Sequence, residues 1–77
     1  MPSVGESAVG EVRSVERAMR ILQLLTESGP LGVGDIALKL GVHKSTASRL
    51  LAELLRYRIV ERLSARGRFT LGPAVDE

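Results

Sequence analysis

The sequence predicts a mainly α-helical domain that ends in a small β-hairpin. Three segments place apolar residues at three- and four-residue intervals, which is the spacing of an amphipathic helix. A single glycine, Gly41, separates the second of these segments from the third. Two short segments near the C-terminus are rich in β-branched, aromatic or alternating residues and flank a turn that contains glycine.

Length and composition allow one small domain. The chain has 77 residues, of which 44% are apolar, and it contains no cysteine, so neither disulfides nor thiolate metal sites can stabilise it. Its apolar stretches are too short to cross a bilayer, and the N-terminus lacks the basic and apolar blocks of a secretory signal. We therefore expect a cytoplasmic protein with no membrane contact.

The first predicted helix follows an arm without periodicity. Residues 1–13, with one proline and two glycines, are expected to be flexible. Ser14 is a residue type that caps helices, and the segment Ser28–Pro30 ends the helix. Its apolar positions are Val15, Ala18, Met19, Leu22 and Leu25.

The segment Val33–Leu51 has the spacing of a helix-turn-helix. Leu31 is expected to be a short extended residue, and Gly32 is a weak cap for a helix over Val33–Leu40. A third helix is expected from about His43 to Tyr57. Gly41 would accept the positive φ that ends one helix, with Val42 filling the junction from inside, and the small Ala37 would allow a close, steep crossing.

The C-terminal segments predict a hairpin. Ile59–Leu63 and Arg68–Leu71 read as strands around the turn at residues 64–67. Three helices followed by a hairpin make a winged helix-turn-helix.

Positive charge is concentrated in the second half of the chain. Met1 to Asp35 hold three basic and five acidic residues, whereas His43 to Leu71 hold seven basic and two acidic residues. This asymmetry is typical of a surface that binds a polyanion, although a merely solvated surface would look the same.

Three motifs resemble the N-terminal DNA-binding domain of the IclR family of bacterial transcription regulators. They are R-A-x-x-I-L in the first helix, K-S-T-x-x-R-L-L in the third, and the aromatic-x-Leu-Gly that closes the hairpin. The resemblance covers residues 14–73. It implies double-stranded DNA as partner, with residues 74–77 beginning a linker to a separate effector-binding domain for a small molecule. It also implies a homodimer or higher oligomer of the full-length protein, for which a palindromic or near-palindromic operator is expected.

Two features depart from the family pattern. Arg58 stands after the third helix, where the family commonly has glycine. Either that position needs a positive φ, which costs a non-glycine residue about 1 kcal/mol, or the helix ends differently. The second helix opens with Gly32 and Gly34 in place of polar caps, so we expect it to be the least stable of the three.

The third helix supplies the candidate DNA-contacting residues. At 100° per residue, Ala47, Leu50, Leu51 and Leu54 fall on one side, and a polar set falls on the other. Thr46 lies at the border, where its hydroxyl would contact phosphate or else bond a local carbonyl. The outward set is Lys44, Ser45, Ser48, Arg49, Ala52 and Arg56.

His43 and the hairpin arginines complete the candidate site. His43 is expected to begin the third helix, to contact phosphate, or to have only a structural role. Arg62, Arg66 and Arg68 are placed to enter a minor groove or to neutralise phosphates, the alternative being charges that protect an exposed strand edge.

Other function classes have little support in the sequence. We predict that the chain is not an enzyme and binds neither metal nor cofactor, since it has one histidine and no catalytic or phosphate-cradling motif. The alternative function is a winged-helix module that binds a protein. Leu24 and Leu38, which fall opposite the predicted apolar faces, favour some protein contact, including contact with a second copy.

Overall fold

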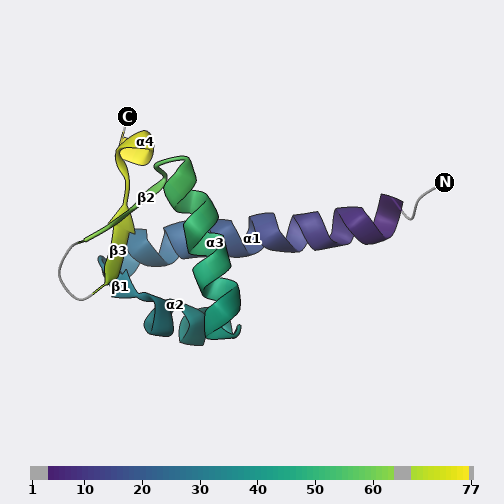
Figure 1. Cartoon of the computed structure of the whole chain (residues 1–77), viewed down its shortest axis with the longest axis horizontal. Helices are drawn as coiled ribbons and strands as arrows, with labels where there is room; N and C mark the ends of the chain where they lie inside the picture. The colour runs from purple at the N-terminus through teal and green to yellow at the C-terminus, as the bar shows by residue number, and fades with distance from the viewer. Residues whose placement is uncertain (1–3, 64–66, 77) are drawn as a thin grey trace.

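The computed structural model describes residues 4–63 and 67–76, with side chains over 12–63 and 67–74. The three predicted helices and the two predicted strands follow in the expected order, and the structure adds a strand, β1, and a short helix, α4 (Figure 1). Helices α2 and α3 form the helix-turn-helix. The elements are α1 (Val4–Ser28), β1 (Leu31–Gly32), α2 (Val33–Leu40), α3 (Lys44–Arg56), β2 (Val60–Arg62), β3 (Arg68–Leu71) and α4 (Pro73–Asp76). This arrangement confirms the winged helix-turn-helix.

The first helix is longer than predicted. Helix α1 begins at Val4, so residues 4–13, which showed no periodicity, are helical, and Ser14 lies inside the helix and does not cap it. Once the packed part of α1 has formed, each further residue adds a hydrogen bond, which offsets the cost of about 1 kcal/mol for each internal glycine. The N-terminal part of α1 extends away from the other elements (Figure 1). Among the described residues, no helix combines the length and the apolarity needed to span a bilayer.

The buried core lies between the three long helices and the sheet. The side chains of Ile21, Ile36, Ala47 and Val60 are fully buried. The remaining buried apolar residues are Leu25, Ala37, Leu51, Leu54 and Phe69. On α1 the predicted apolar face is partly wrong, because Val15 is 59% and Met19 55% exposed. The face of α1 that packs against the core contains Ile21 and does not contain Val15 or Met19.

Glycine ends α2 as predicted. Gly41 has φ 71° and ψ 35°, the left-handed conformation. Its N–H donates to the carbonyl of Leu38 at 3.2 Å, and the Val42 N–H donates to the carbonyl of Ala37 at 3.0 Å. This pair of bonds is a Schellman motif. Val42 is half-buried and packs against the core, which confirms that it fills the junction.

The same motif ends α3, with arginine in place of glycine. The N–H of Arg58 donates to the carbonyl of Leu55, and that of Ile59 donates to the carbonyl of Leu54, both at 3.0 Å. Arg58 has φ 60° and is the one non-glycine residue with positive φ in the described part of the chain. The residue after α3 therefore does adopt the left-handed conformation, and in this chain that residue is an arginine where the family commonly has glycine.

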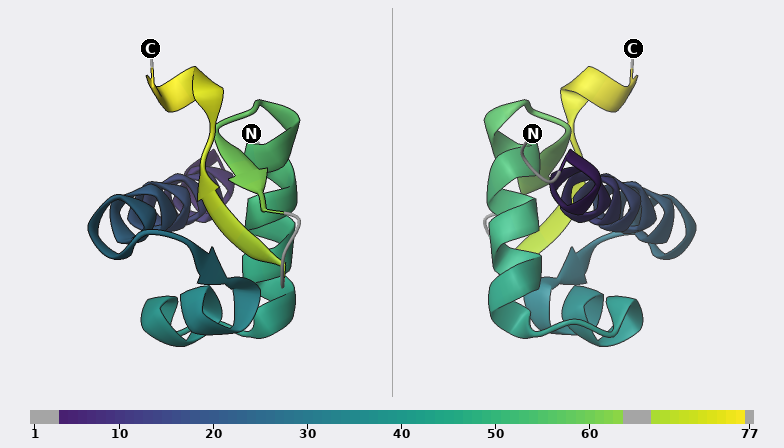
Figure 2. Two further views of the ribbon diagram at one scale, coloured as in Figure 1. Left: turned by 90° about the vertical axis from the view of Figure 1, so that its left-hand side faces the viewer. Right: turned by 90° about the vertical axis from the view of Figure 1, so that its right-hand side faces the viewer.

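The sheet has three strands in the order β1-β3-β2, all antiparallel (Figure 2). Val60 pairs with Leu71 and Arg62 with Phe69, which forms the expected hairpin, the wing. On its other edge Phe69 pairs with Leu31, so the residue predicted to be merely extended belongs to a third strand. The wing is thereby joined to the chain segment that enters α2.

Gly72 closes the wing because no side chain fits there. Its N–H donates to the carbonyl of Ile59 at 2.8 Å. A Cβ on Gly72 would lie 2.3 Å from the carbonyl oxygen of Arg58, closer than any real contact. The glycine of the aromatic-x-Leu-Gly motif thus permits the backbone after β3 to pack against the end of α3.

Replacing Arg58 with glycine is expected to stabilise the domain. The left-handed conformation costs a non-glycine residue about 1 to 2 kcal/mol, and glycine loses about 0.5 to 1 kcal/mol more backbone entropy on folding. Arg58→Gly should therefore raise the free energy of unfolding by about 0.5 to 1 kcal/mol, measured by urea denaturation. Ala52→Gly, in the middle of α3, serves as the control and should lower it by about 1 kcal/mol. A loss of stability in Arg58→Gly would contradict the strain assigned to Arg58.

Candidate nucleic-acid interface

The outward face of α3 is formed as its periodicity predicted. Ala47, Leu51 and Leu54 are buried, whereas the outward side chains are exposed. Thr46 and Leu50, four residues apart, are half-buried along the same border of the helix. The exposed side chains are Lys44, Ser45, Ser48, Arg49, Ala52, Glu53 and Arg56.

His43 is the N-cap residue of α3 through its backbone alone. It is extended, with φ −69° and ψ 151°, and its side chain makes no capping hydrogen bond. Its carbonyl accepts the N–H of Ala47 at 3.1 Å. The exposed imidazole therefore lies at the start of the helix and takes no part in fixing it.

Arg56 and Thr46 have different surroundings from the rest of the set. Arg56 lies 3.3 Å from the carboxylate of Glu53, and its guanidinium is 5.7 Å from the ring centre of Tyr57. Both members of that exposed ion pair are accessible, so the pair adds little stability. Within the part of the chain that the structure describes, the Thr26 hydroxyl bonds a helical carbonyl and the Thr46 hydroxyl does not. The local-carbonyl alternative for Thr46 is therefore not realised.

The wing carries arginines on both of its strands. Arg62 lies on β2 and Arg68 on β3, and both are exposed. The Arg62 guanidinium is 5.2 Å from the ring centre of Phe69, a cation–π arrangement that orients it. Arg66, the third predicted wing residue, lies outside the described residues.

A shallow groove separates α3 from the wing. We call it the wing groove; its volume is about 270 Å³. Small residues, Ser48 and Ala52, form its α3 side, and Arg62 and Gly67 form its wing side. Val33, Leu51, Leu55 and Phe69 also line it. The wing and the outward face of α3 thus belong to one continuous surface.

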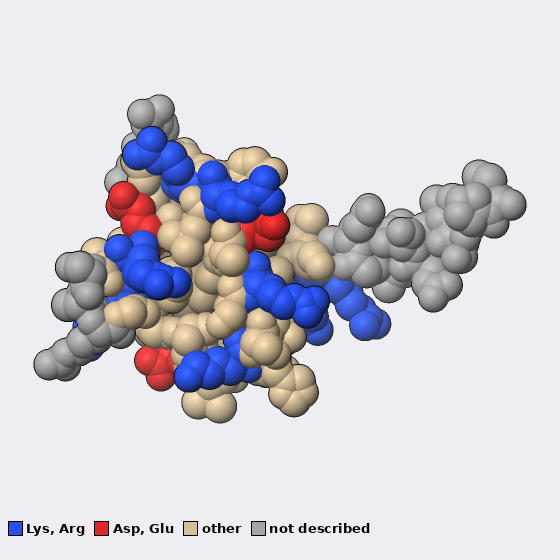
Figure 3. All heavy atoms as spheres, in the orientation of Figure 1, with Lys and Arg blue, Asp and Glu red and all other residues tan. Residues whose placement is uncertain are grey.

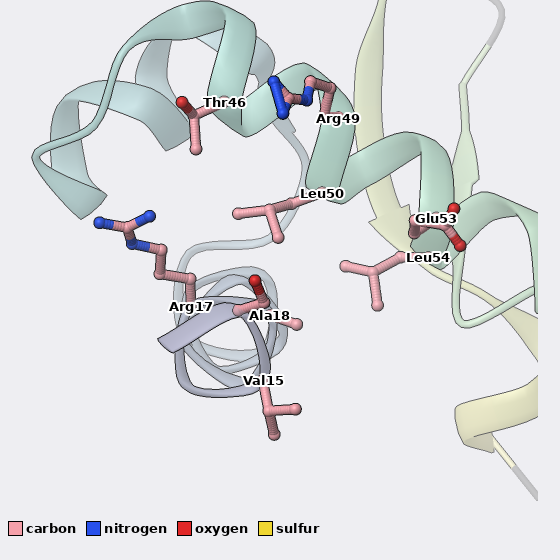
Figure 4. A pocket seen from close by; sticks show the side chains of 9 residues that line it. Val15, Arg17, Ala18, Thr46, Arg49, Leu50, Glu53 and Leu54 are labelled. Carbon is pink, nitrogen blue, oxygen red and sulfur yellow. The ribbon is translucent and has the colours of Figure 1, made fainter. Parts of the chain in front are cut away.

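A larger groove lies on the other side of α3, against α1. This α1–α3 groove has a volume of about 490 Å³ and is lined by Ser14, Val15, Arg17, Ala18, Thr46, Arg49, Leu50, Glu53 and Leu54. Figure 4 shows Arg17 reaching from α1 toward the Thr46 end of α3, with Val15 on the other side of α1. Arg17 is the first residue of the R-A-x-x-I-L motif, but the sequence did not place it among the candidate contacts, because only the crossing of α1 and α3 brings it beside the predicted residues.

Positive charge predominates on this face of the molecule. Figure 3 shows lysine and arginine side chains spread over α3 and the adjoining elements, with few acidic groups among them. The described residues contain no cluster of side chains suited to hold a metal ion. The surface is therefore basic, with short side chains at its centre and arginines around it.

Comparison with known proteins identifies relatives for most of the chain. A family model described as the IclR helix-turn-helix domain matches residues 14–64. The glycerol operon regulatory proteins of Streptomyces coelicolor and Streptomyces griseus are each 42% identical to this chain over 62 residues, covering 79% of it. The chain spans about a quarter of the length of these curated relatives, of which it covers 24%.

Solved structures share the fold. An IclR transcriptional regulator from Alicyclobacillus acidocaldarius has a TM-score of 0.78 at 35% identity, covering 82% of this chain and 26% of that one. An IclR family regulator from Brucella abortus also gives 0.78, at 28% identity, covering 97% of this chain and 29% of that one. The Zalpha domain of Carassius auratus PKZ, crystallised in complex with Z-DNA, gives 0.72 at 25% identity, covering 77% of this chain and 97% of that one.

Proposed function

The chain belongs to the IclR helix-turn-helix family of transcriptional regulators, and we propose that it reads duplex DNA with α3 in the major groove and the wing on the flanking backbone or minor groove. The observation that carries this proposal is the outward face of α3. That face is exposed along the whole helix and is polar and basic, while the opposite face is buried.

The size of the side chains supports the orientation of α3. An α-helix about 10 to 12 Å across fills a major groove about 12 Å wide, so the backbone of the helix must approach the bases closely. Ser45, Ser48 and Ala52 are short enough to allow this approach. Lys44 and Arg49 are exposed on either side of these short residues and are long enough to reach base edges or phosphates.

The wing contributes charge beside that face. Arg62 lies across the wing groove from Ser48 and Ala52. Arg68 is exposed on the neighbouring strand β3 and does not line the groove. Arginines in this position neutralise phosphates or enter a narrow minor groove. We assign Arg66 the same role from the sequence pattern alone, and His43 a phosphate contact at the start of α3.

The full-length protein is proposed to act as a homodimer or higher oligomer on a palindromic operator. One α3 covers a single half-site, so two copies are needed for strong and selective binding. Exposed apolar residues on α1, Val12, Val15 and Met19, offer a surface for a second copy. Leu38 is 81% exposed and offers another, whereas Leu24 is already half-buried.

The remaining assignments follow from the family. We propose a non-enzymatic cytoplasmic protein whose small-molecule effector binds a separate domain. The relatives are named as regulators, and the chain corresponds to about a quarter of their length. The glycerol operon named for two of these relatives makes related operons the first to test as targets.

Arg49 is expected to read bases. Arg49→Ala should weaken binding to a duplex selected by the dimeric protein by about 1 to 3 kcal/mol and relax discrimination at one position of the half-site. Titration of selected and scrambled duplexes measures both effects, with circular dichroism as the check on folding. Arg20→Ala, which removes an exposed arginine from α1, is the control. Unchanged affinity in Arg49→Ala would remove Arg49 from the interface.

The wing arginines are expected to contribute to DNA affinity independently of the base sequence of the duplex. Arg62→Ala combined with Arg68→Ala should weaken binding to selected and scrambled duplexes alike. If each arginine neutralises one phosphate, the slope of log affinity against log salt should become less steep by about 1.8. Binding is measured over a series of salt concentrations for both proteins. An unaltered slope would mean that the wing points away from DNA.

Two copies are expected on one palindrome. Analytical ultracentrifugation should find two chains bound to a palindromic duplex, with the second binding more tightly than to an isolated half-site. Met19→Glu places a charge in the exposed apolar surface of α1 and should abolish that gain. Arg20→Glu places the carboxylate one residue further along, about 100° around the helix, and should retain it. A gain that survives in Met19→Glu would exclude this surface as the contact.

A further inference from the structure

Helix α3 has a groove on each of its long sides. The wing groove is bounded by Arg62, and the α1–α3 groove is bounded by Arg17. Each groove is therefore lined by an arginine from an element that packs beside α3, β2 in one case and α1 in the other. The wing has an assigned role in the proposed function, and Arg17 has none.

A helix in the major groove has a phosphate backbone on each side. Because the helix nearly fills the groove, the two DNA backbones that border the groove run along its two flanks. If the wing meets one backbone, the other must pass the flank that faces α1. The following inference rests on the proposed function, since it assumes that α3 enters the major groove.

The groups at one end of the α1–α3 groove suit a phosphate. Arg17 is half-buried and comes from α1, whereas Thr46 and Arg49 come from the first two turns of α3. The one ion pair found among the described residues joins Arg56 to Glu53, so neither Arg17 nor Arg49 is neutralised there by an acidic partner. A guanidinium and a hydroxyl from two different helices are a donor set that phosphate oxygens accept well.

The other end of the groove does not suit an anion. Val15 and Leu54 make it apolar, and Glu53 adds a carboxylate. Figure 4 shows Glu53 and Leu54 together, away from Thr46 and Arg17. Charge therefore selects the Thr46 end, which is also the end of α3 that carries Lys44 and Ser45.

We propose that Arg17 and Thr46 bind a backbone phosphate of DNA at the Thr46 end of the α1–α3 groove, on the side of α3 opposite to the wing. Helix α1 then takes part in DNA binding and does more than support the core. The contact fixes the rotation of α3 about its axis, because phosphates would be held on both flanks of the helix.

The first test is the salt dependence of binding to a short duplex of mixed sequence, which needs no knowledge of the operator. Arg17→Gln should make the slope of log affinity against log salt less steep by about 0.9, the value for one phosphate. Arg17→Lys should restore the slope because it restores the charge. Arg20→Gln removes an exposed arginine that does not line the groove and should leave the slope unchanged.

The second test locates the phosphate. Single methylphosphonate substitutions, which remove the charge of one phosphate at a time, are scanned along a duplex selected by the protein. One position should weaken binding of the unaltered protein and have no effect on Arg17→Gln. Thr46→Val, which keeps the shape of the side chain and removes the hydroxyl, should weaken binding several-fold and lose sensitivity at the same position. It carries the test if Arg17→Gln does not fold.

The outcomes separate the two proposals. If the unaltered protein binds no duplex at any salt concentration, the proposed function fails. If it binds, and Arg17→Gln retains both the slope and the full methylphosphonate pattern, the function stands and the α1 contact is wrong. Equal loss of slope in Arg17→Gln and Arg20→Gln would also overturn it, since that result reflects net charge and not a bound phosphate.

Discussion

The close packing of α2 against α3 is the constraint on which the rest of the structure depends. Ala37 and Ala47 are both buried, and their small side chains allow the two helices to cross near the tight turn at Gly41. Ile36 and Leu51 then fill the space against α1, so one face of α3 is fixed inward. The opposite face, with Lys44 and Arg49, is exposed as a consequence of this packing and not through any bond of its own.

Three backbone positions set where the other elements meet α3. Gly41 takes the left-handed conformation at low cost, and Arg58 takes it at the cost of strain at the far end of α3. Gly72 lets the chain after β3 pass against the carbonyl of Arg58. The wing is therefore attached to the end of α3 by the backbone, with β1 holding its other edge. These contacts set the position of the wing relative to α3.

The sequence predicted those parts of the fold that depend on neighbouring residues. The apolar spacing of α3, the turn at Gly41 and the position of β3 are local patterns, and all three are present in the structure. The predictions from sequence were wrong or incomplete where tertiary contacts determine which residues are buried or paired. Helix α1 carries two overlapping apolar stripes, and only packing shows that Ile21 is buried while Val15 and Met19 are exposed. Strand β1 has two residues and exists because β3 pairs with it.

In the candidate site, too, some residues can be predicted from local sequence and others only from tertiary packing. Helical periodicity alone places Ser48 and Arg49 on the outward face, since both lie on one regular helix. Arg17 and Thr46 each belong to a quoted motif, but β1, α2 and a turn separate them, so nothing in the sequence shows that the two side chains lie close together. Their shared groove results from the crossing of α1 over α3. The contacts proposed on the flanks of α3 therefore follow from the packing of the whole domain, whereas those proposed on α3 itself follow from its sequence.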